Sequence, residues 1–493
     1  MSLYRPQRPL MAVLALLGGL LYPLAFAPYD FWPLVLLSIA LAWWTLGATA
    51  KQAFWRGWLY GLGLFGFGVS WLHVSMHDYG DTPLWLAVPM TALFAAFLAL
   101  FPALLAALTV KFSRGRPSPL LFAGGWLLLD VLRGALLTGF PWLYAGYALI
   151  DTPLVAAAPL GGVWLMTLIA VLAGLTLALA WQRRPSAFVT GALLLLGGAT
   201  PLLPLERFIE PAADAPTKVA LVQGNIPQDL RWLATMRDAT RDIYAGLTAE
   251  IGSDTLVVWP EAALTEFYDT AREFLAEQSA LLAARDSALI SGLPTRDWQG
   301  DGWRYYNSIL VVEGGEGIYD KQKLVPFGEY VPLESLLRGL IPFFDLPMSS
   351  FTPGPAKQDN LLAQYMVVSP FICYEIVYPE LVARQAADSN VMVTISNDAW
   401  FGHSAGPHQH FQMARLRAAE TGRYLLRATN NGITAIIDER GVVQGQLPQF
   451  ERAVLEGSFM PFSGSTPFVR WGGAPVWWLA ALLCGVGLLA RRR

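Results

Sequence analysis

A cysteine, a glutamate and a lysine stand where a covalent mechanism would need them. Cys373 follows one apolar, strand-like run and Glu261 follows another, while Lys321 lies shortly before the string Leu-Val-Pro-Phe-Gly-Glu. A thiol nucleophile requires a base to remove its proton, and positive charge or hydrogen-bond donors where an oxyanion develops. Because α/β enzymes assemble such groups at the ends of separate strands, the three residues predict a site for catalysis by a cysteine thiol.

Each of these residues also has an ordinary interpretation. A free cysteine is most often a small buried hydrophobe, a glutamate after a strand is often a helix cap, and a lone lysine is usually solvated. The second of the two cysteines, Cys484, lies in an apolar stretch near the end of the chain, so there is neither a disulfide framework nor zinc-ligand spacing. The prediction therefore rests on the combination of residues.

The elements that must position these residues form an alternating pattern within residues 217–460. Short segments rich in β-branched residues alternate with longer segments of helical composition. This alternation predicts an α/β layered domain. The predicted strands are 218–226, 255–260, 288–293, 307–312, 366–374 and 391–396, and the predicted helices are 232–251, 270–285 and 409–424.

Residues 1–207 and 472–493 are predicted to be embedded in a membrane. The chain is 54% hydrophobic and only 14% charged, whereas an ordinary soluble protein carries about 25% charged residues. Apolar runs near the length of a bilayer span predict seven spans before the α/β region and one after it. These runs are 10–27, 31–48, 54–76, 83–110, 119–139, 157–181, 187–204 and 473–490.

The charges of the short loops predict how the spans are oriented. Basic residues gather in alternate loops, and the loops between them contain aspartates but no Lys or Arg. Because positive charge stays on the cytoplasmic side, we expect both termini in the cytoplasm and residues 217–460 outside. The basic residues are Arg5, Arg8, Lys51, Arg56, Lys111, Arg114, Arg116, Arg183 and Arg184; the aspartates are Asp30, Asp78, Asp81 and Asp151.

Longer strings around the three residues carry a resemblance. The chain reads Val-Trp-Pro-Glu-Ala at 258–262, Leu-Val-Pro-Phe-Gly-Glu-Tyr-Val-Pro at 324–332, Ile-Cys-Tyr-Glu-Ile at 372–376 and Ser-Asn-Asp-Ala-Trp-Phe-Gly at 396–402. These strings, with seven spans before them and one after, resemble the bacterial apolipoprotein N-acyltransferase family of the nitrilase (carbon-nitrogen hydrolase) superfamily. The resemblance covers the whole chain, with no departure at the three catalytic positions.

The resemblance implies a fold and a reaction. The fold would be an αββα sandwich outside the membrane, in the bacterial periplasm. Cys373 would attack the ester of a phospholipid and form a thioester, with Glu261 as the general base. Lys321 and a backbone N–H after Cys373 would stabilise the oxyanion. The acyl chain would then pass to the N-terminal amine of a diacylglyceryl-cysteine on a lipoprotein, with no cofactor or metal.

The resemblance also implies supporting residues. Glu329 and Glu375 would support the lysine and the site, while Trp232, Asn307 and Tyr374 would line or shape the pocket. We expect the protein to act as a monomer, because nothing in the sequence requires a partner chain.

An apolar segment interrupted by prolines, 340–348, stands out within the α/β region. It contains Phe343 and Phe344, and paired aromatic side chains can anchor at a membrane interface. We expect a mobile segment that dips towards the membrane to admit lipid chains. The alternative is a loop packed on the protein core.

Two weaker patterns lie inside the predicted spans. The glycines at 61, 63 and 66 spell G-x-G-x-x-G. No strand precedes them, so close helix packing is favoured over dinucleotide binding. Asp130 and Arg133 are spaced as neighbours on one helix face, which favours an internal ion pair over contact with a lipid headgroup.

Three histidines, His403, His408 and His410, cluster in the sequence. Their spacing matches no common zinc site, so a loop or pocket rim is favoured. The formal net charge of −3 gives no reason to expect a nucleic-acid partner.

Two other functions remain open at this point. A membrane-tethered hydrolase of small amides or nitriles would use the same three residues, but it would not need seven preceding spans. A transporter with an external accessory domain would need polar residues along several spans, and few are present. An acyl adduct on Cys373 would separate these functions.

Overall fold

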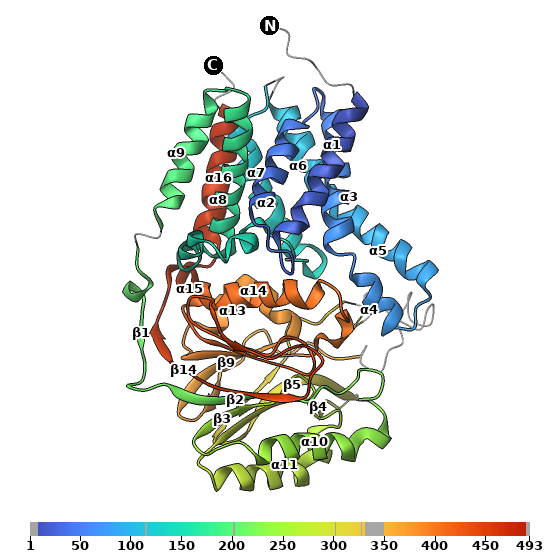
Figure 1. Ribbon diagram of the computed structural model, residues 1–493, viewed down its shortest axis with the longest axis vertical. Helices are drawn as coiled ribbons and strands as arrows, with labels where there is room; N and C mark the ends of the chain where they lie inside the picture. Colours follow the sequence, from blue (N-terminus) through green and yellow to red (C-terminus); the bar gives the residue numbers. More distant parts are fainter. Residues whose placement is uncertain are drawn as a thin grey trace. The chain divides into compact units, whose positions relative to one another are not determined.

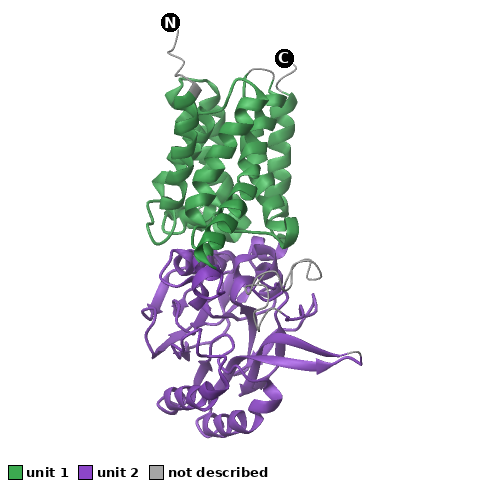
Figure 2. Cartoon of the chain, turned by 90° about the vertical axis from the view of Figure 1, so that its right-hand side faces the viewer, with its two compact units in different colours: residues 1–73, 83–204, 471–493 green, residues 74–82, 205–470 purple. Residues whose placement is uncertain are grey.

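The computed structural model describes residues 8–113, 116–200, 203–300, 302–326, 328–330 and 350–489. The chain divides into two compact units, shown in different colours in Figure 2. One is helical and comprises residues 1–73, 83–204 and 471–493. The other comprises residues 74–82 and 205–470 and contains the sheets.

Apolar helices make up the first unit. Among the described residues, three helices are long and apolar enough to cross a membrane: Leu84–Phe112, Pro119–Thr138 and Pro153–Trp181. A fourth span results if the bent pair Ala50–Gly68 and Leu72–Asp78 counts as one. Shorter apolar helices occupy Pro9–Ala25, Pro33–Trp44, Ser186–Gly198 and Ala474–Leu489. Every predicted span therefore falls on an apolar helix or helix pair, and the count of eight spans stays a prediction.

Two of the three glycines at 61–66 are used for close packing. They lie on α3 (Ala50–Gly68), which crosses α1 (Arg8–Leu21) and α6 (Leu100–Phe112). A Cβ on Gly61 would come within 2.6 Å of Ala99 Cα, and one on Gly63 would overlap the carbonyl oxygen of Leu16. Gly66 has open space around it. The packing interpretation is therefore confirmed for two positions and wrong for the third.

Asp130 and Arg133 form an internal ion pair, as expected. They lie on α7 (Pro119–Ala135), and Arg133 Nη2 is 2.8 Å from Asp130 Oδ1. Arg133 also donates to the carbonyl oxygens of Phe140 at 2.8 Å and Trp142 at 2.7 Å. The pair thus ties the end of this helix to the loop that follows it.

The second unit is built on two main sheets (Figure 1). The six-stranded sheet has the order β14 (Ala453–Phe459), β2 (Thr217–Gln223), β3 (Thr255–Val258), β4 (Ala288–Trp298), β5 (Trp303–Glu313), β7 (Ile318–Asp320). The seven-stranded sheet has the order β13 (Val443–Gln446), β12 (Ala435–Ile437), β11 (Leu425–Thr429), β10 (Val391–Ser396), β9 (Met366–Ile372), β8 (Leu361–Ala363), β6 (Gly315–Glu316). Strands β2–β4 are parallel, and so are β9–β11.

Helices cover the outer face of each sheet, which gives four layers (Figure 1). Helices α10 (Arg237–Ala249) and α11 (Tyr268–Ala283) pack on the six-stranded sheet, and α13 (Pro379–Gln385) and α14 (Gly406–Thr421) on the other. Along β2, Val219 and Leu221 join the core between the sheets, while Ala220 and Val222 join the core beneath the helices. Both faces are buried, which explains the unbroken apolar runs. The αββα sandwich is therefore confirmed.

All six predicted strands and all three predicted helices exist; β10 has the predicted bounds, and the others have shifted ends. The helix expected from 232 begins at Arg237, because residues 230–236 form turns and a short 3₁₀ helix. The strand expected to reach 374 ends at Ile372. Strands β4 and β5 run on into an antiparallel hairpin that pairs Trp298 with Trp303.

Candidate active site

Cys373 lies at a sharp turn where β9 ends. Its φ is +51°, in the left-handed region that non-glycine residues seldom adopt, and the 3₁₀ helix Cys373–Val377 follows at once. Such backbone strain persists only where surrounding contacts hold it. One contact is a hydrogen bond of 2.9 Å from the N–H of Ile372 to the Glu375 carboxylate. The chain therefore leaves the strand abruptly at Cys373.

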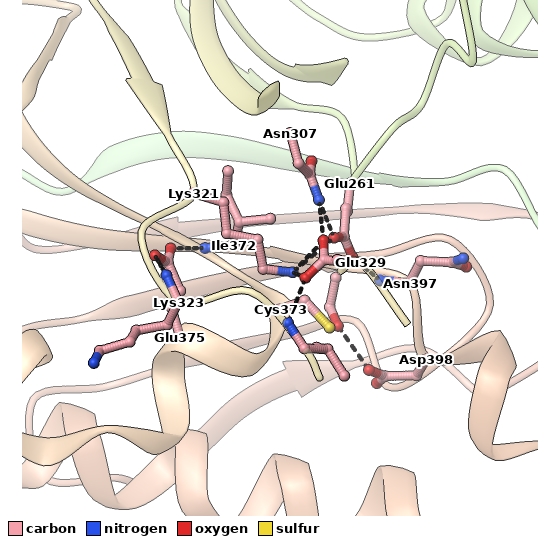
Figure 3. A network of polar contacts seen from close by, with 12 residues as sticks. Glu261, Asn307, Lys321, Lys323, Glu329, Ile372, Cys373, Glu375, Asn397 and Asp398 are labelled. Atoms are coloured by element: carbon pink, nitrogen blue, oxygen red, sulfur yellow. Dashed lines mark hydrogen bonds and ion pairs between the residues drawn. The ribbon is translucent and has the colours of Figure 1, made fainter. Parts of the chain in front are cut away.

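Lys321 lies between two carboxylates (Figure 3). Its Nζ is 3.4 Å from Glu261 Oε1 and 2.9 Å from Glu329. Asn307 Nδ2 donates to the same two carboxylates, at 2.8 Å to Glu261 and 2.9 Å to Glu329. All four side chains are buried. The structure therefore joins four of the residues named from the sequence into one network.

Three of these residues belong to strands of the six-stranded sheet or closely follow them. Glu261 follows β3 and Lys321 follows β7, while Asn307 lies on β5 between them. The remaining oxygen of Glu261 accepts a 2.8 Å hydrogen bond from the N–H of Asn397, which follows β10 of the other sheet. The carboxylate of Glu261 thus connects the two sheets at the edge where Cys373 lies.

The thiol of Cys373 lies beside this network (Figure 3). Burial raises the pKa of the thiol, and the charge of Glu261 raises it further, while Lys321 opposes the rise. A hydrogen bond with the Ser396 side chain also favours the thiolate. The balance leaves Cys373 protonated at neutral pH, so this nucleophile needs a base.

Lys321 carries its positive charge in the buried site. Burial alone would lower the pKa of the ammonium group, but the charges of Glu329 and Glu261 outweigh burial and raise it. The resting site therefore holds two carboxylates, one ammonium and one neutral thiol. The formal charge of this site is negative, so a thiolate would add a second negative charge. Transfer of the thiol proton to Glu261 avoids that increase.

Glu375 organises the backbone on either side of the site. Its Oε1 accepts hydrogen bonds from Tyr319 Oη at 3.0 Å and from the N–H groups of Gln322 at 2.7 Å and Lys323 at 3.1 Å. Its other oxygen holds Ile372. Glu375 thus ties the chain after Lys321 to the chain before Cys373. Burial raises the pKa of its carboxyl to about 7, against the stabilising effect of these donors.

Of the other residues expected at the site, Tyr374 and Trp232 lie within the described residues. Tyr374 is half-buried, and its ring packs edge-on against Tyr378 at 5.3 Å. Trp232 is half-buried too, and its indole N–H has no hydrogen-bond partner among the described residues. Phe343 and Phe344 lie outside the described residues.

The three histidines contact different groups. His403 packs on the Phe450 ring at 4.1 Å, and His408 contacts Gln449 at 3.2 Å. His410 Nε2 is 3.2 Å from the carbonyl oxygen of Cys373. Across the described part of the chain, no group of three His, Cys, Asp or Glu residues is arranged to hold a metal ion.

Several residues at the site carried no recognisable signal of their own. Arg231 is buried and donates to the backbone oxygens of Glu261, at 3.2 Å, and of Ala262. Asn397 contacts the Glu261 carboxylate through its own backbone N–H, and the His410 ring contacts the backbone oxygen of Cys373. A side chain that holds a distant backbone atom leaves no spacing pattern in the sequence. Asn397 lies within the string Ser-Asn-Asp-Ala-Trp, but the string predicted no role for this residue.

The two-sheet unit is that of a carbon-nitrogen hydrolase, since the family model of that description matches residues 218–459. A second model, the apolipoprotein N-acyltransferase N-terminal domain, matches residues 18–176. Apolipoprotein N-acyltransferase from Azotobacter vinelandii is 49% identical over 490 residues, covering 97% of this chain and 95% of that protein. The chain belongs to the apolipoprotein N-acyltransferase family.

Other relatives with the same name agree over their full length. The protein from Pseudomonas aeruginosa PAO1 is 46% identical over 97% of this chain and 96% of its own. That from Vibrio parahaemolyticus is 40% identical over 99% of both chains. Both units of the structure are therefore shared with these relatives.

Proposed function

We propose that this protein is a bacterial membrane acyltransferase that moves an acyl chain from a phospholipid to a lipoprotein. The acceptor is the N-terminal amine of an S-diacylglyceryl-cysteine. Membership of the apolipoprotein N-acyltransferase family supports the reaction. The observation that carries the mechanism is the buried Lys321 between Glu261 and Glu329, beside the thiol of Cys373.

In the first half-reaction Cys373 Sγ attacks the ester carbonyl of the phospholipid. Glu261 takes the thiol proton as the C–S bond forms, so the total charge of the site stays unchanged. The negative charge moves to the carbonyl oxygen, where Lys321 and a backbone N–H after Cys373 stabilise it. The ester C–O bond then breaks. The leaving lysophospholipid oxygen takes the proton back from Glu261, which leaves a thioester on Cys373.

In the second half-reaction the lipoprotein amine attacks the thioester carbonyl. Glu261 accepts a proton from the amine nitrogen while the same groups stabilise the second oxyanion. The C–S bond breaks, an amide forms, and Cys373 recovers its proton from Glu261. One carboxylate serves as base and acid in both halves, as general acid–base catalysis requires.

The remaining network residues hold this base in place. Asn307 and the N–H of Asn397 bind the two oxygens of Glu261 at 2.8 Å each. Glu329 holds Lys321, and its second oxygen accepts from the N–H of Val325 at 2.9 Å. These fixed donors favour one orientation of the carboxylate, which supports its role as the proton acceptor.

We also propose an arrangement in the membrane. Residues 1–207 would provide seven spans and residues 472–493 an eighth, with both termini cytoplasmic and the catalytic domain, 217–460, in the periplasm of the inner membrane. The basic loops and the apolar helices at every predicted span support this topology. The protein would act as a monomer.

An acyl adduct on Cys373 tests the function directly. Purified protein in detergent is incubated with a phospholipid of defined acyl chains, and the mass of the peptide containing Cys373 is measured by mass spectrometry. We expect a thioester that disappears when a diacylglyceryl lipopeptide is added, with the acyl chain recovered as an amide. The Cys373→Ala variant should give no adduct or product, while Cys484→Ala should behave as wild type.

The alternatives make different forecasts in the same experiment. A hydrolase of small amides or nitriles would take no acyl chain from the phospholipid and would instead hydrolyse a small amide or nitrile added in its place. A transporter with an accessory domain would form no adduct. Transfer activity retained by the Cys373→Ala variant would rule out the thioester mechanism.

A further inference from the structure

His410 contacts the backbone of the nucleophile from the helical layer. It lies on α14, is 1% exposed, and its Nε2 is 3.2 Å from the carbonyl oxygen of Cys373. A carbonyl oxygen can only accept, so Nε2 carries the proton of this hydrogen bond. The mechanism described above gives His410 no proton to transfer. Its contact with the nucleophile therefore requires another explanation.

A buried network fixes the ring of His410. Arg427 Nη2 is 2.6 Å from Asp398 Oδ2 and 3.2 Å from His410 Nδ1. Asp398 Oδ1 lies 3.2 Å from the same ring nitrogen and accepts from Ser396 Oγ at 2.7 Å. All these side chains are buried. They come from β10, the turn after it, α14 and β11.

The protonation state of the ring follows from its surroundings. Burial lowers the pKa of His410, and the charge of Arg427 lowers it further, against the opposing effect of Asp398. The ring is therefore neutral at neutral pH. With the proton on Nε2, Nδ1 accepts from Arg427. Asp398 is itself an acceptor, so it makes no hydrogen bond to Nδ1 and is held beside the ring by Arg427 and Ser396. His410 thus presents one fixed donor, aimed at Cys373.

The hydrogen bond from His410 acts on a whole peptide plane, the one between Cys373 and Tyr374. In a trans peptide the C=O and N–H groups point in opposite directions within one plane. Holding the carbonyl oxygen of Cys373 therefore also directs the N–H of Tyr374, which belongs to the same plane. That N–H is the backbone group proposed to stabilise the oxyanion. The bond from His410 and the bond from Ile372 N–H to Glu375 lie on either side of the strained φ of Cys373.

We propose that His410 is a positioning residue that orients the Cys373–Tyr374 peptide bond for oxyanion stabilisation. The proposal rests on the thioester mechanism proposed above. The Arg427–Asp398 pair keeps the ring in the orientation that donates to Cys373. A displacement of about 1 Å at a reacting group can cost about 100-fold in rate, so loss of this donor should slow acylation without weakening phospholipid binding.

Two amide substitutions separate the contact with Cys373 from the contact with Asp398 and Arg427. In His410→Gln the amide nitrogen reaches the place of Nε2, so it can still donate to the Cys373 carbonyl. In His410→Asn the amide reaches only the place of Nδ1. Both variants stay polar and bury an amide. The control is His408→Asn, on the same helix but in contact with Gln449.

Single-turnover formation of the Cys373 thioester is measured at several phospholipid concentrations. We expect His410→Asn to lower the limiting rate by about 10 to 100-fold, with the half-saturating concentration unchanged. His410→Gln should recover most of the rate, and His408→Asn should match wild type. Alkylation of Cys373 by iodoacetamide forms no oxyanion, so it should fall less than acylation in His410→Asn.

Three results would overturn the role of His410. The first is equal loss of rate in the Gln and Asn variants when both melt as wild type does. The second is a wild-type rate in His410→Asn. The third is a loss that follows the folded fraction alone. A wild-type protein that forms no thioester at all would instead contradict the proposed function, and this role with it.

Discussion

At the scale of single residues, Glu261 should affect Cys373 in two opposite ways. Glu261→Gln removes the base, so thioester formation should fall by roughly 10²–10⁴-fold. The same change removes a negative charge that raises the pKa of the thiol. The thiol should therefore ionise at lower pH in the variant. Single-turnover acylation and the pH profile of iodoacetamide alkylation measure the two effects separately.

Both effects must be observed for the assignment of Glu261 as the base to hold. Acylation should slow while the alkylation profile shifts to lower pH. An unchanged burst of thioester in Glu261→Gln would show that another group is the base. An unchanged alkylation profile would show that the carboxylate does not interact with the thiol.

Lys321→Ala should impair both half-reactions, because each passes through an oxyanion that the ammonium group stabilises. It should also destabilise the protein by roughly 3–5 kcal/mol, because it leaves buried carboxylates without their cation. Lys323→Ala is the matched control: this neighbouring lysine is exposed and lies over the Tyr378 ring at 5.3 Å. Thioester formation and thermal unfolding should both change in the first variant and neither in the second. Normal transfer by folded Lys321→Ala would remove the lysine from the mechanism.

The residues proposed to transfer or neutralise charge could be predicted from the sequence, and so could Glu375, which lies in the same string as Cys373. The residues that hold carbonyl oxygens from distant positions could not. Glu261, Lys321 and Cys373 have side chains with a defined chemical task, at strand ends and within recognisable strings. His410 and Arg231 act on carbonyl oxygens 37 and 30 to 31 positions away in the chain. Nothing local distinguishes them from other buried polar residues.

At the scale of elements, Glu375 joins the end of β7 to the end of β9, and its titration should be visible in stability. Its pKa is raised from 4.5 to about 7. Between these values the folded protein holds a proton that the unfolded chain has lost. The contribution is therefore fully present below pH 4.5 and disappears as pH rises through about 7, on the order of 3 kcal/mol in all.

Glu375→Gln isolates this effect, because glutamine does not titrate. We expect wild type to lose unfolding free energy from about pH 5 to 7, and the variant to show a flatter dependence over the same interval. The variant should be less stable throughout, since an amide cannot accept from all four donors. Parallel pH profiles for the two proteins would contradict the raised pKa.

Element types were predictable here because the strands are buried on both faces. After its first residue, Thr255, β3 is entirely apolar, and every one of its residues is buried. The edge strand β6 has two residues, both exposed, and β8 has only three residues, so neither is long enough to give a pattern. The start of α10 was placed too early because the turns after Pro227 contain residues of good helical propensity. Element boundaries depend on such local turns more than on periodicity.

At the scale of the whole molecule, the two lipid substrates require an apolar path to Cys373. Replacing Phe343 and Phe344 together by serine should reduce acyl transfer from phospholipid, because the sequence leads us to expect that the segment 340–348 admits lipid chains. Alkylation of Cys373 by a small water-soluble reagent should be retained. A control replaces Trp298 and Trp303, two exposed aromatic residues of the β4–β5 hairpin, by serine.

Joint loss of transfer, alkylation and thermal stability in the double phenylalanine variant would identify the segment as core packing. Equal loss of transfer in the tryptophan control would show that exposed aromatic area alone, and not this segment, governs lipid entry.

The protonated state of Cys373 has a consequence for how long the enzyme survives. Peroxide and disulfide reagents attack thiolates far more readily than thiols. Because burial and the charge of Glu261 keep the sulfur protonated, we expect the resting protein to resist oxidative damage. The nucleophile becomes reactive when a substrate carbonyl receives its electrons and Glu261 receives its proton. An exposed, permanently ionised cysteine would react faster with electrophiles of every kind, including the oxidants of the periplasm, where we propose that this domain lies.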